Sequence, residues 1–316
     1  MSFDLFEGTG RPRRPVPSPD NPDPRPWDLP DLPEWRKRNR SAPKFAMPKG
    51  LTAAVNTALN LRRPLLLTGA AGSGKSTVVE LIAAELGVAP VLRWHITSKT
   101  TLQDGLYEYD ALERLRATQN NDPDSSIERF VKLGPLGTAL ADREKPRAVL
   151  IDEIDKSDLD LPGDMLNVLE AGEFEITPLW RTVRADADRD HLVRGADGRE
   201  DYLVSGGMVR TEHYPVIVFT SNQERTFPAP FLRRCVRYKM EPPDEEFLTT
   251  IVTEHLGGVD ARQREIIGDF ARRLREGQEV AISQLIELVE LVTSHRLGPD
   301  QVNEVREILL EPLAGK

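Results

Sequence analysis

The sequence has almost no cysteine and no long hydrophobic run. Its one cysteine among 316 residues, Cys235, excludes an internal disulfide framework and a cysteine metal site, and it fits a reducing compartment. The longest apolar runs, such as PVIVF, are far too short to cross a bilayer. The first residues, MSFDLFEGTGRPRRP, lack the apolar core of a signal peptide. We therefore expect a cytoplasmic protein with no membrane partner.

An excess of positive charge is also missing. The chain carries 42 Lys and Arg residues against 51 Asp and Glu residues, a formal net charge of -9. Domains held on nucleic acid by bulk charge are usually basic, so this composition argues against a nucleic-acid partner. Two basic clusters, at residues 11–14 and 36–40, could still form a local patch that binds nucleic acid. The five histidines form no metal-ligand spacing.

Proline is plentiful, but mainly at the start of the chain. Eleven of the 25 prolines fall in the first 50 residues. Proline at this density blocks helices and strand ladders, so we expect residues 1–43 to form an extended or disordered arm. The arm is either a solvated linker or a tail that docks on a neighbouring surface through Trp27 and Trp35. A plain linker has little use for tryptophan.

From about residue 44 the sequence alternates between apolar strand patterns and helix patterns. Strands are predicted within residues 64–68, 88–97, 148–152 and 215–222. Helices are predicted over residues 51–61 and 76–87, and residues 164–176 are predicted to form a helix that leads into a turn. This alternation predicts an α/β core over residues 44–241 with a parallel sheet. The polar residues 179–211 predict a hairpin or a mobile loop. Helical patterns then predict a helical domain over residues 242–316.

A glycine-rich run directly follows the first strand pattern. It fits the phosphate-loop pattern G-x-x-x-x-G-K-[ST] at every position. Glycines let backbone N–H groups surround phosphate oxygens, and the helix that opens at Gly74 directs its N-terminal dipole at the same anion. Lys75 can reach the β- and γ-phosphates of ATP, and the Ser76 hydroxyl can coordinate Mg²⁺. The predicted binding residues are Gly69, Ala70, Ala71, Gly72, Ser73, Gly74, Lys75, Ser76 and Thr77.

Two carboxylates end the third strand pattern. Asp152 and Glu153 follow the apolar run AVLI, at the end of a parallel strand where open sheets bind ligands. Asp152 suits the Mg²⁺ shell, and Glu153 suits a general base that deprotonates the attacking water. The pair could also be a solvated strand end, but the complete phosphate loop upstream favours a site. Metabolite kinases often lack the second acid, so Glu153 favours hydrolysis.

A polar side chain, Asn222, ends the next strand pattern, VIVFTSN. Its amide can hold the attacking water or touch the γ-phosphate, although asparagine in such a place is often only a turn former. Its position after a phosphate loop and an acid pair favours the role in catalysis.

The order GAAGSGKS, LIDEID, TSN and FLRRC resembles the core of an AAA+ ATPase. The segments KLGPLGTAL, DKSDLDLPGDMLNVLEAGEFEI and TSNQERTFPAPFLRRC resemble the MoxR-like branch, and the similarity covers about residues 44–237. The resemblance implies a doubly wound parallel sheet, a helical lid and a ring of identical subunits, expected to be a hexamer, with ATP between subunits. It gives the family's usual roles to Lys75, Ser76, Asp152, Glu153 and Asn222.

The same resemblance implies an arginine finger at Arg233 or Arg234. A guanidinium delivered by a neighbouring subunit neutralises charge that develops in phosphoryl transfer, and it couples turnover to assembly. Many lids of this family carry a further arginine at the start of a late helix. Here the segment EVAISQLIELVELV has Ser283 and Gln284 at that place, and the nearest basic candidate is Arg296.

These features favour an ATP-driven machine that remodels or activates a partner protein. The MoxR-like resemblance implies a chaperone-like role, often beside a von Willebrand A-domain protein or in a bacterial defence system. The alternative is a signalling or assembly switch with slow hydrolysis, which the absence of an arginine at positions 283 and 284 and the tryptophan-bearing arm favour. A DNA-acting motor would need a basic surface, and a small-molecule kinase would need no arginine from a neighbour.

Overall fold

The computed structural model describes Pro48 and residues 50–70, 73–182, 189–256, 258–278, 280–295 and 297–310. The predicted arm, residues 1–43 with Trp27 and Trp35, lies outside these residues. The chain divides into two compact units, of which one spans Phe45–Pro242 and the other includes Pro243–Lys316. Within the described ranges, no helix is long and apolar enough to cross a membrane.

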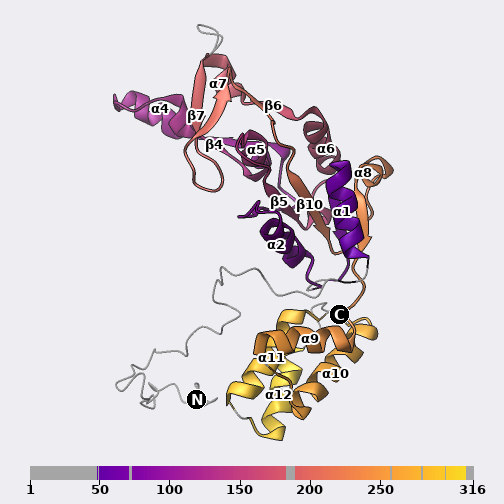
Figure 1. Cartoon of the computed structure of the whole chain (residues 1–316). Coiled ribbons are helices and arrows are strands. Elements are labelled where there is room, and N and C mark those ends of the chain that lie inside the picture. Colours follow the sequence, from indigo (N-terminus) through magenta and orange to yellow (C-terminus); the bar gives the residue numbers. More distant parts are fainter. Residues whose placement is uncertain are drawn as a thin grey trace, which may run out of the picture. The chain divides into compact units, whose positions relative to one another are not determined.

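The first unit is built on a five-stranded sheet (Figure 1). Every pair of neighbouring strands is parallel, so the carboxyl ends of all five strands lie at one edge. This arrangement confirms the predicted doubly wound parallel sheet. The sequence pattern misses strand β11, because half-buried and exposed residues alternate along it, as is typical of an edge strand. In spatial order the strands are β11 (Val236–Lys239), β1 (Leu65–Thr68), β10 (Val216–Ser221), β5 (Ala148–Asp152) and β2 (Leu92–His95).

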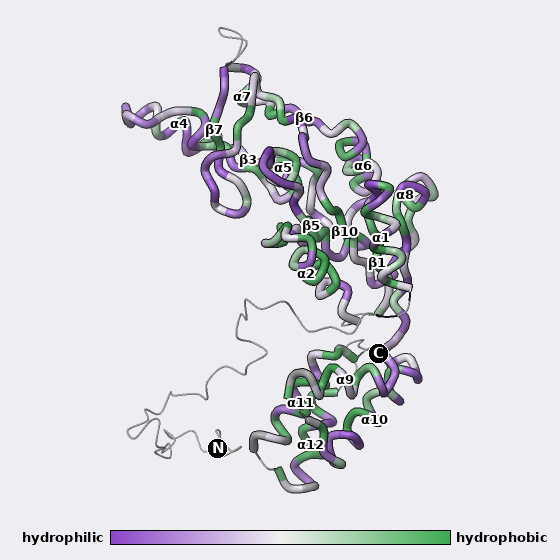
Figure 2. Tube along the Cα trace, viewed as in Figure 1, coloured by the Kyte–Doolittle hydropathy of each residue, from purple (hydrophilic) through white to green (hydrophobic). Residues whose placement is uncertain are grey.

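Helices cover both faces of this sheet. Leu65 and Leu67 share one apolar cluster with Val78 of α2 (Lys75–Glu85), whereas Leu66, between them, belongs to a second cluster on the opposite face. Because both faces are buried, strands such as β10 are mostly hydrophobic along their length (Figure 2). Helices α1 (Leu51–Leu61) and α2 (Lys75–Glu85) cover the first face, and α5 (Pro135–Ala141), α6 (Leu161–Ala171) and α8 (Ala229–Arg234) cover the second.

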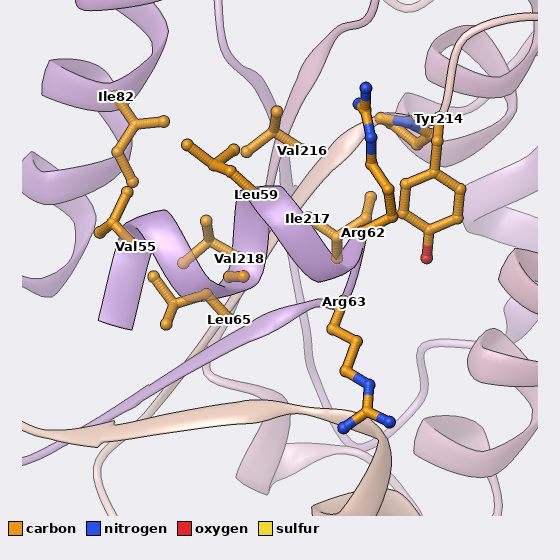
Figure 3. A pocket seen from close by; sticks show the side chains of 12 residues that line it. Val55, Leu59, Arg62, Arg63, Leu65, Ile82, Tyr214, Val216, Ile217 and Val218 are labelled. Carbon is orange, nitrogen blue, oxygen red and sulfur yellow. The ribbon is translucent and has the colours of Figure 1, made fainter. Parts of the chain in front are cut away.

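A small apolar cavity lies between α1 and the start of β10 (Figure 3). Val55, Leu59 and Ile82 line it, together with Arg62 and Tyr214. Its enclosed space is about 20 Å³, room for about one water molecule. Ligand pockets are far larger, so this cavity is a packing gap and not a nucleotide site.

Two small antiparallel sheets stand beside the main sheet. The first pairs β3 (Tyr107–Tyr109) with β4 (Val131–Leu133). The second has the strand order β6 (Glu173–Glu175), β9 (Met208–Arg210), β8 (Tyr202–Ser205) and β7 (Asp190–Val193). Residues 179–211 therefore contain a hairpin, formed by β7 and β8, and also strand β9, which pairs with β6. Of the two predicted alternatives for this segment, its described part forms the hairpin and not the loop. The helices that accompany these strands are α3 (Leu102–Leu106), α4 (Ala111–Gln119), η1 (Ile127–Phe130) and α7 (Thr177–Thr182).

A buried arginine fastens the four-stranded sheet to the main one. Arg147 directly precedes β5 and is 2% exposed. Its Nη1 donates to Asp142 Oδ2 at 3.1 Å, Asp197 Oδ2 at 2.9 Å and Tyr202 Oη at 3.0 Å. Burial works against the charged guanidinium, but the hydrogen bonds to Asp197 and Asp142 outweigh it and raise the pKa of Arg147. The β7–β8 connection is thus tied to the start of the strand that ends in the acid pair.

The described part of the second unit is helical. Its four helices share one apolar core, which includes Leu248, Phe270, Leu285 and Leu288. The predicted helical C-terminal region is confirmed. The helices are α9 (Glu245–Leu256), α10 (Ala261–Arg275), α11 (Ile282–His295) and α12 (Pro299–Leu309).

Candidate functional site

The glycine-rich loop joins the carboxyl end of β1 to the start of α2. Gly69 has φ of 146°, and a Cβ there would lie 2.6 Å from the Met240 carbonyl oxygen, so no other residue fits. Gly74 takes the left-handed N-cap position of α2, with φ of 86°. Ala71 and Gly72, also predicted to bind phosphate, lie outside the described residues. The loop's described ends have the conformation that its glycines allow.

Lys75 turns its ammonium group back toward this loop. The side chain is 7% exposed, and Nζ donates to Gly69 O at 2.9 Å and to Ala70 O at 2.7 Å. Burial lowers the pKa of Lys75, and the negative charges of Asp152, Asp155 and Glu153 oppose this shift. A desolvated ammonium group within the loop is a strong partner for an incoming phosphate.

A second polar group in the loop is buried without a partner. Ser73 is 5% exposed, and its Oγ makes no hydrogen bond within the described part of the chain. Buried hydroxyl groups are normally satisfied, so this one has spare hydrogen-bonding capacity. Together with Lys75 and the N-terminus of α2, it makes the loop fit a phosphate group.

Asp152 ends β5 next to Ser76. Ser76 Oγ donates to Asp152 Oδ1 at 3.3 Å, and Thr220 Oγ1, from the adjacent strand β10, donates to the same oxygen. A hydroxyl and a carboxylate side by side are oxygen ligands of the kind that Mg²⁺ takes at phosphate sites. Ser76 and Asp152 therefore fit the predicted ion. Among the described residues, no group of three or more His, Cys, Asp or Glu side chains is arranged to hold a metal ion by itself.

Glu153 follows in a left-handed backbone conformation with φ of 60°. Its N–H donates to Thr220 Oγ1 at 3.0 Å, which anchors the residue to β10. Its Oε2 lies 2.8 Å from Lys156 Nζ and 3.4 Å from His95 Nε2, at the end of β2. The hydrogen bond to Glu153 raises the pKa of Lys156. The carboxylate is thus held at the same sheet edge as Asp152.

Asn222 directly follows β10 and completes the arrangement. Its Oδ1 accepts a hydrogen bond from Lys75 Nζ at 2.9 Å, across 147 residues of sequence. The structure therefore brings the predicted residues Lys75, Ser76, Asp152 and Asn222 together at the carboxyl edge of the sheet. Thr77 lies in the first turn of α2 and is half-buried.

The two candidate finger arginines lie in the last turn of α8 and differ in their surroundings. Arg234 Nε lies 2.6 Å from Glu170 Oε1 on α6. Arg233 is exposed and, among the described residues, has no hydrogen-bond or ion-pair partner. Within the described ranges, no hydrogen bond or ion pair links either arginine to the loop or the acid pair of its own chain.

Residues that the sequence analysis did not single out also shape this edge. Thr220 is 1% exposed and joins Asp152 to Glu153, and Asp155 is 4% exposed beside them. His95 and Lys156 hold the Glu153 carboxylate. Thr220 stands in the TSN motif and Asp155 in DEID, but their contacts depend on how β5 and β10 pair, which the local pattern does not contain.

Gln284 stands where the resemblance implies a lid arginine. Its Oε1 accepts a hydrogen bond from the Ala281 N–H at 2.6 Å, and its Nε2 donates to Leu309 O at 2.7 Å. Gln284 is therefore used inside the helical unit. Arg296, the other candidate, lies outside the described residues.

Comparison with known proteins gives one family and several structures of similar fold. The family described as AAA domain (dynein-related subfamily) matches residues 64–235. The RuvB Holliday junction branch migration motor of Thermotoga maritima is 14% identical, with a TM-score of 0.42, over 82% of this chain and 67% of that chain. NtrX from Brucella abortus in complex with ATP is 15% identical, with a TM-score of 0.38, over 83% of this chain and 55% of that chain. No curated protein sequence matches the chain.

Proposed function

Since the chain belongs to the AAA domain family, in its dynein-related subfamily, and is a nucleotide-binding ATPase, we propose that it hydrolyses Mg-ATP between the subunits of a ring. One observation carries the proposal. Hydrogen bonds link three separate segments of the chain at one edge of the sheet. The residues that make these bonds are Lys75, Ser76, Asp152 and Asn222. The phosphate loop alone would bind a nucleotide, whereas the acids and the amide beside it equip the site for hydrolysis.

Each of these residues has a separate task in the proposed reaction. Lys75 and the loop would hold the β- and γ-phosphates, and Ser76 and Asp152 would hold Mg²⁺. When bound, Mg²⁺ supplies positive charge that stabilises the negative charge developing on the phosphates. Asn222 stays within hydrogen-bond reach of Lys75 and orients the γ-phosphate or the attacking water.

Glu153 is the proposed general base. It orients the attacking water and accepts its proton as the water attacks the γ-phosphate. Its Oε2 is bound by Lys156 and lies close to His95, so the carboxylate has to exchange these partners for water during turnover. Thr220 keeps the Glu153 backbone in place while the side chain moves.

Arg233 is the proposed arginine finger. A finger has to leave its own subunit's surface and reach the γ-phosphate of a neighbour. Arg233 is exposed and has no ion-pair partner in the described part, whereas Arg234 is paired with Glu170. The difference in pairing favours Arg233. The site is then complete only between two subunits, which favours a ring, in keeping with the hexamer that the resemblance implies.

We also propose that residues 242–316 form the lid domain and that the ATPase acts on a partner protein. The MoxR-like motifs after the acid pair and around FLRRC support a chaperone-like role, with a von Willebrand A-domain protein as the expected partner. The second candidate is an assembly switch with slow hydrolysis. It is favoured by Gln284, which stands in place of a lid arginine and is bonded within its own unit.

Turnover per subunit, measured against protein concentration at fixed Mg²⁺, tests the interface site. We expect the rate per subunit to rise steeply with concentration, because Arg233 comes from a neighbour. Light scattering at each concentration reports whether the ring has dissociated. A rate that stays constant while the ring falls apart into single subunits would contradict the proposal.

A further inference from the structure

Two turns run side by side next to the proposed site. One follows β5 and contains Glu153 and the short 3₁₀ helix η2 (Ile154–Lys156). The other follows β10, begins at Asn222 and leads to α8, which carries Arg233. Because each turn carries a residue of the proposed site, whatever joins the turns also sets the geometry of the site.

Asp155 makes the first connection. Its Oδ2 accepts hydrogen bonds from the backbone N–H groups of Asn222 at 3.0 Å and Glu224 at 3.1 Å. Asp155 is 4% exposed and forms no ion pair within the described residues, although its charge acts on Lys75 and Lys156. Gln223, between the two donors, has φ of 65°, so the carboxylate binds the two ends of a strained turn. A buried carboxylate bound only by backbone N–H groups holds that backbone firmly.

Arg225 makes the second connection from the opposite turn. Its Nη2 donates to Ser157 Oγ at 2.9 Å and to Asp158 O at 2.7 Å. Together with the two bonds of Asp155, four hydrogen bonds join the turns. Three residues after Arg225, Pro228 is the N-cap of α8. The loop between Asn222 and α8 is therefore fixed over its first four residues, 222–225.

We infer that Asp155 and Arg225 are positioning residues, which lock the turn after β5 to the turn after β10. Asp155 fixes the Asn222 backbone so that the Asn222 amide meets Lys75, and Arg225 fixes the loop that leads to Arg233. The inference rests on the proposed function, since it assigns the residues that hold the parts of that same site in register.

The structure distinguishes the hydrogen bonds of Asp155 from its charge. Both N–H groups donate to the same oxygen, Oδ2, while Oδ1 has no partner within the described residues. Asp155→Asn keeps an acceptor oxygen at that place and removes the charge, whereas Asp155→Ala removes both. If the hydrogen bonds position Asn222, only the alanine variant should fail.

Steady-state ATP hydrolysis and binding of a fluorescent ATP analogue separate positioning from binding. We expect Asp155→Ala to lower kcat by about 10- to 100-fold, because displacements of about 1 Å can weaken catalysis that much. The Kd of the analogue should stay within about threefold, since a positioning residue does not touch the nucleotide. Asp155→Asn should keep kcat within about threefold of wild type. Arg225→Ala should lower kcat with unchanged Kd, and Arg210→Ala, which removes an exposed ion pair with Glu173, is the control.

Each outcome decides the inference. It is overturned if Asp155→Ala keeps the wild-type kcat, or if Asp155→Asn loses as much as Asp155→Ala, because the charge would then be what matters. A folded Asp155→Ala that no longer binds the analogue also overturns it. If Asp155→Ala does not fold, Arg225→Ala carries the same test from the opposite turn. Wild-type protein without turnover would instead remove the proposed function, and the inference with it.

Discussion

Replacing Glu153 by Gln is expected to lower kcat for ATP hydrolysis by at least about 100-fold, the usual contribution of a general base. The amide cannot accept the proton of the attacking water, although it has nearly the same shape. Binding of ATP should persist, because Lys75, Ser76 and the loop are unchanged. Steady-state hydrolysis gives kcat, and binding of a fluorescent ATP analogue gives Kd.

A matched control is Glu173→Gln, an exposed carboxylate at the start of β6 that is paired with Arg210. It should leave kcat unchanged. If Glu153→Gln retained more than half of the wild-type rate, another group would have to be the base. The same variant separates the two candidate functions, because a motor would lose its function and an assembly switch would stay locked in its active assembly.

Replacing Arg147 by Met is expected to produce the largest loss of stability. Asp142 and Asp197 would remain, with side chains 1% and 10% exposed, and would lose the cation that pairs with both. Breaking a buried ion pair by removing one partner costs about 3–5 kcal/mol. The thermal midpoint of the α/β unit should fall by roughly 10 °C for a unit of this size. Thermal unfolding followed by circular dichroism measures the shift.

Arg199→Met is the control for this variant. Arg199 pairs with the exposed Asp201 and Glu144, and its Nη1 lies 3.7 Å from Oδ2 of the buried Asp142, which Arg147 holds more closely; the Arg199 side chain itself is 36% exposed. Ion pairs at the surface contribute little, so the midpoint should move by only a few degrees. Equal midpoints for Arg147→Met and wild type would mean that the buried group does not fasten the two sheets.

The main sheet could be predicted because its strands are buried on both faces. AVLID and PVIVFTSN are almost continuously apolar, and the polar residues that end them, such as Asp152 and Asn222, mark the carboxyl edge. Strand β11 lacks this signal because it lies at the edge. Of the four-stranded antiparallel sheet, the sequence predicted at most the hairpin, since the segment is polar and the sheet is held by Arg147, whose partners lie up to 55 residues away.

The sequence motifs predicted which residues form the site, but not the side-chain contacts that hold them together. The phosphate loop, the acid pair and Asn222 each follow a strand pattern, so their meeting follows from the parallel sheet. The connection from Asp155 to the Asn222 N–H spans 67 residues and depends on the register of β5 and β10. The choice of Arg233 over Arg234 depends on Glu170 of α6, which no local pattern identifies.

The central claim is that each ATP site is completed by a neighbouring subunit, and mixing two inactive variants tests it most directly. Glu153→Gln has no base but keeps Arg233, and Arg233→Ala keeps the base but has no finger. Each alone should be nearly inactive. In rings that mix at random, about half of the subunits carry Glu153 and about half of their neighbours carry Arg233, so about a quarter of the sites have both. An equal mixture should therefore recover about a quarter of the wild-type rate per subunit. A mixture no more active than its two components, in rings shown to exchange subunits, would contradict the account.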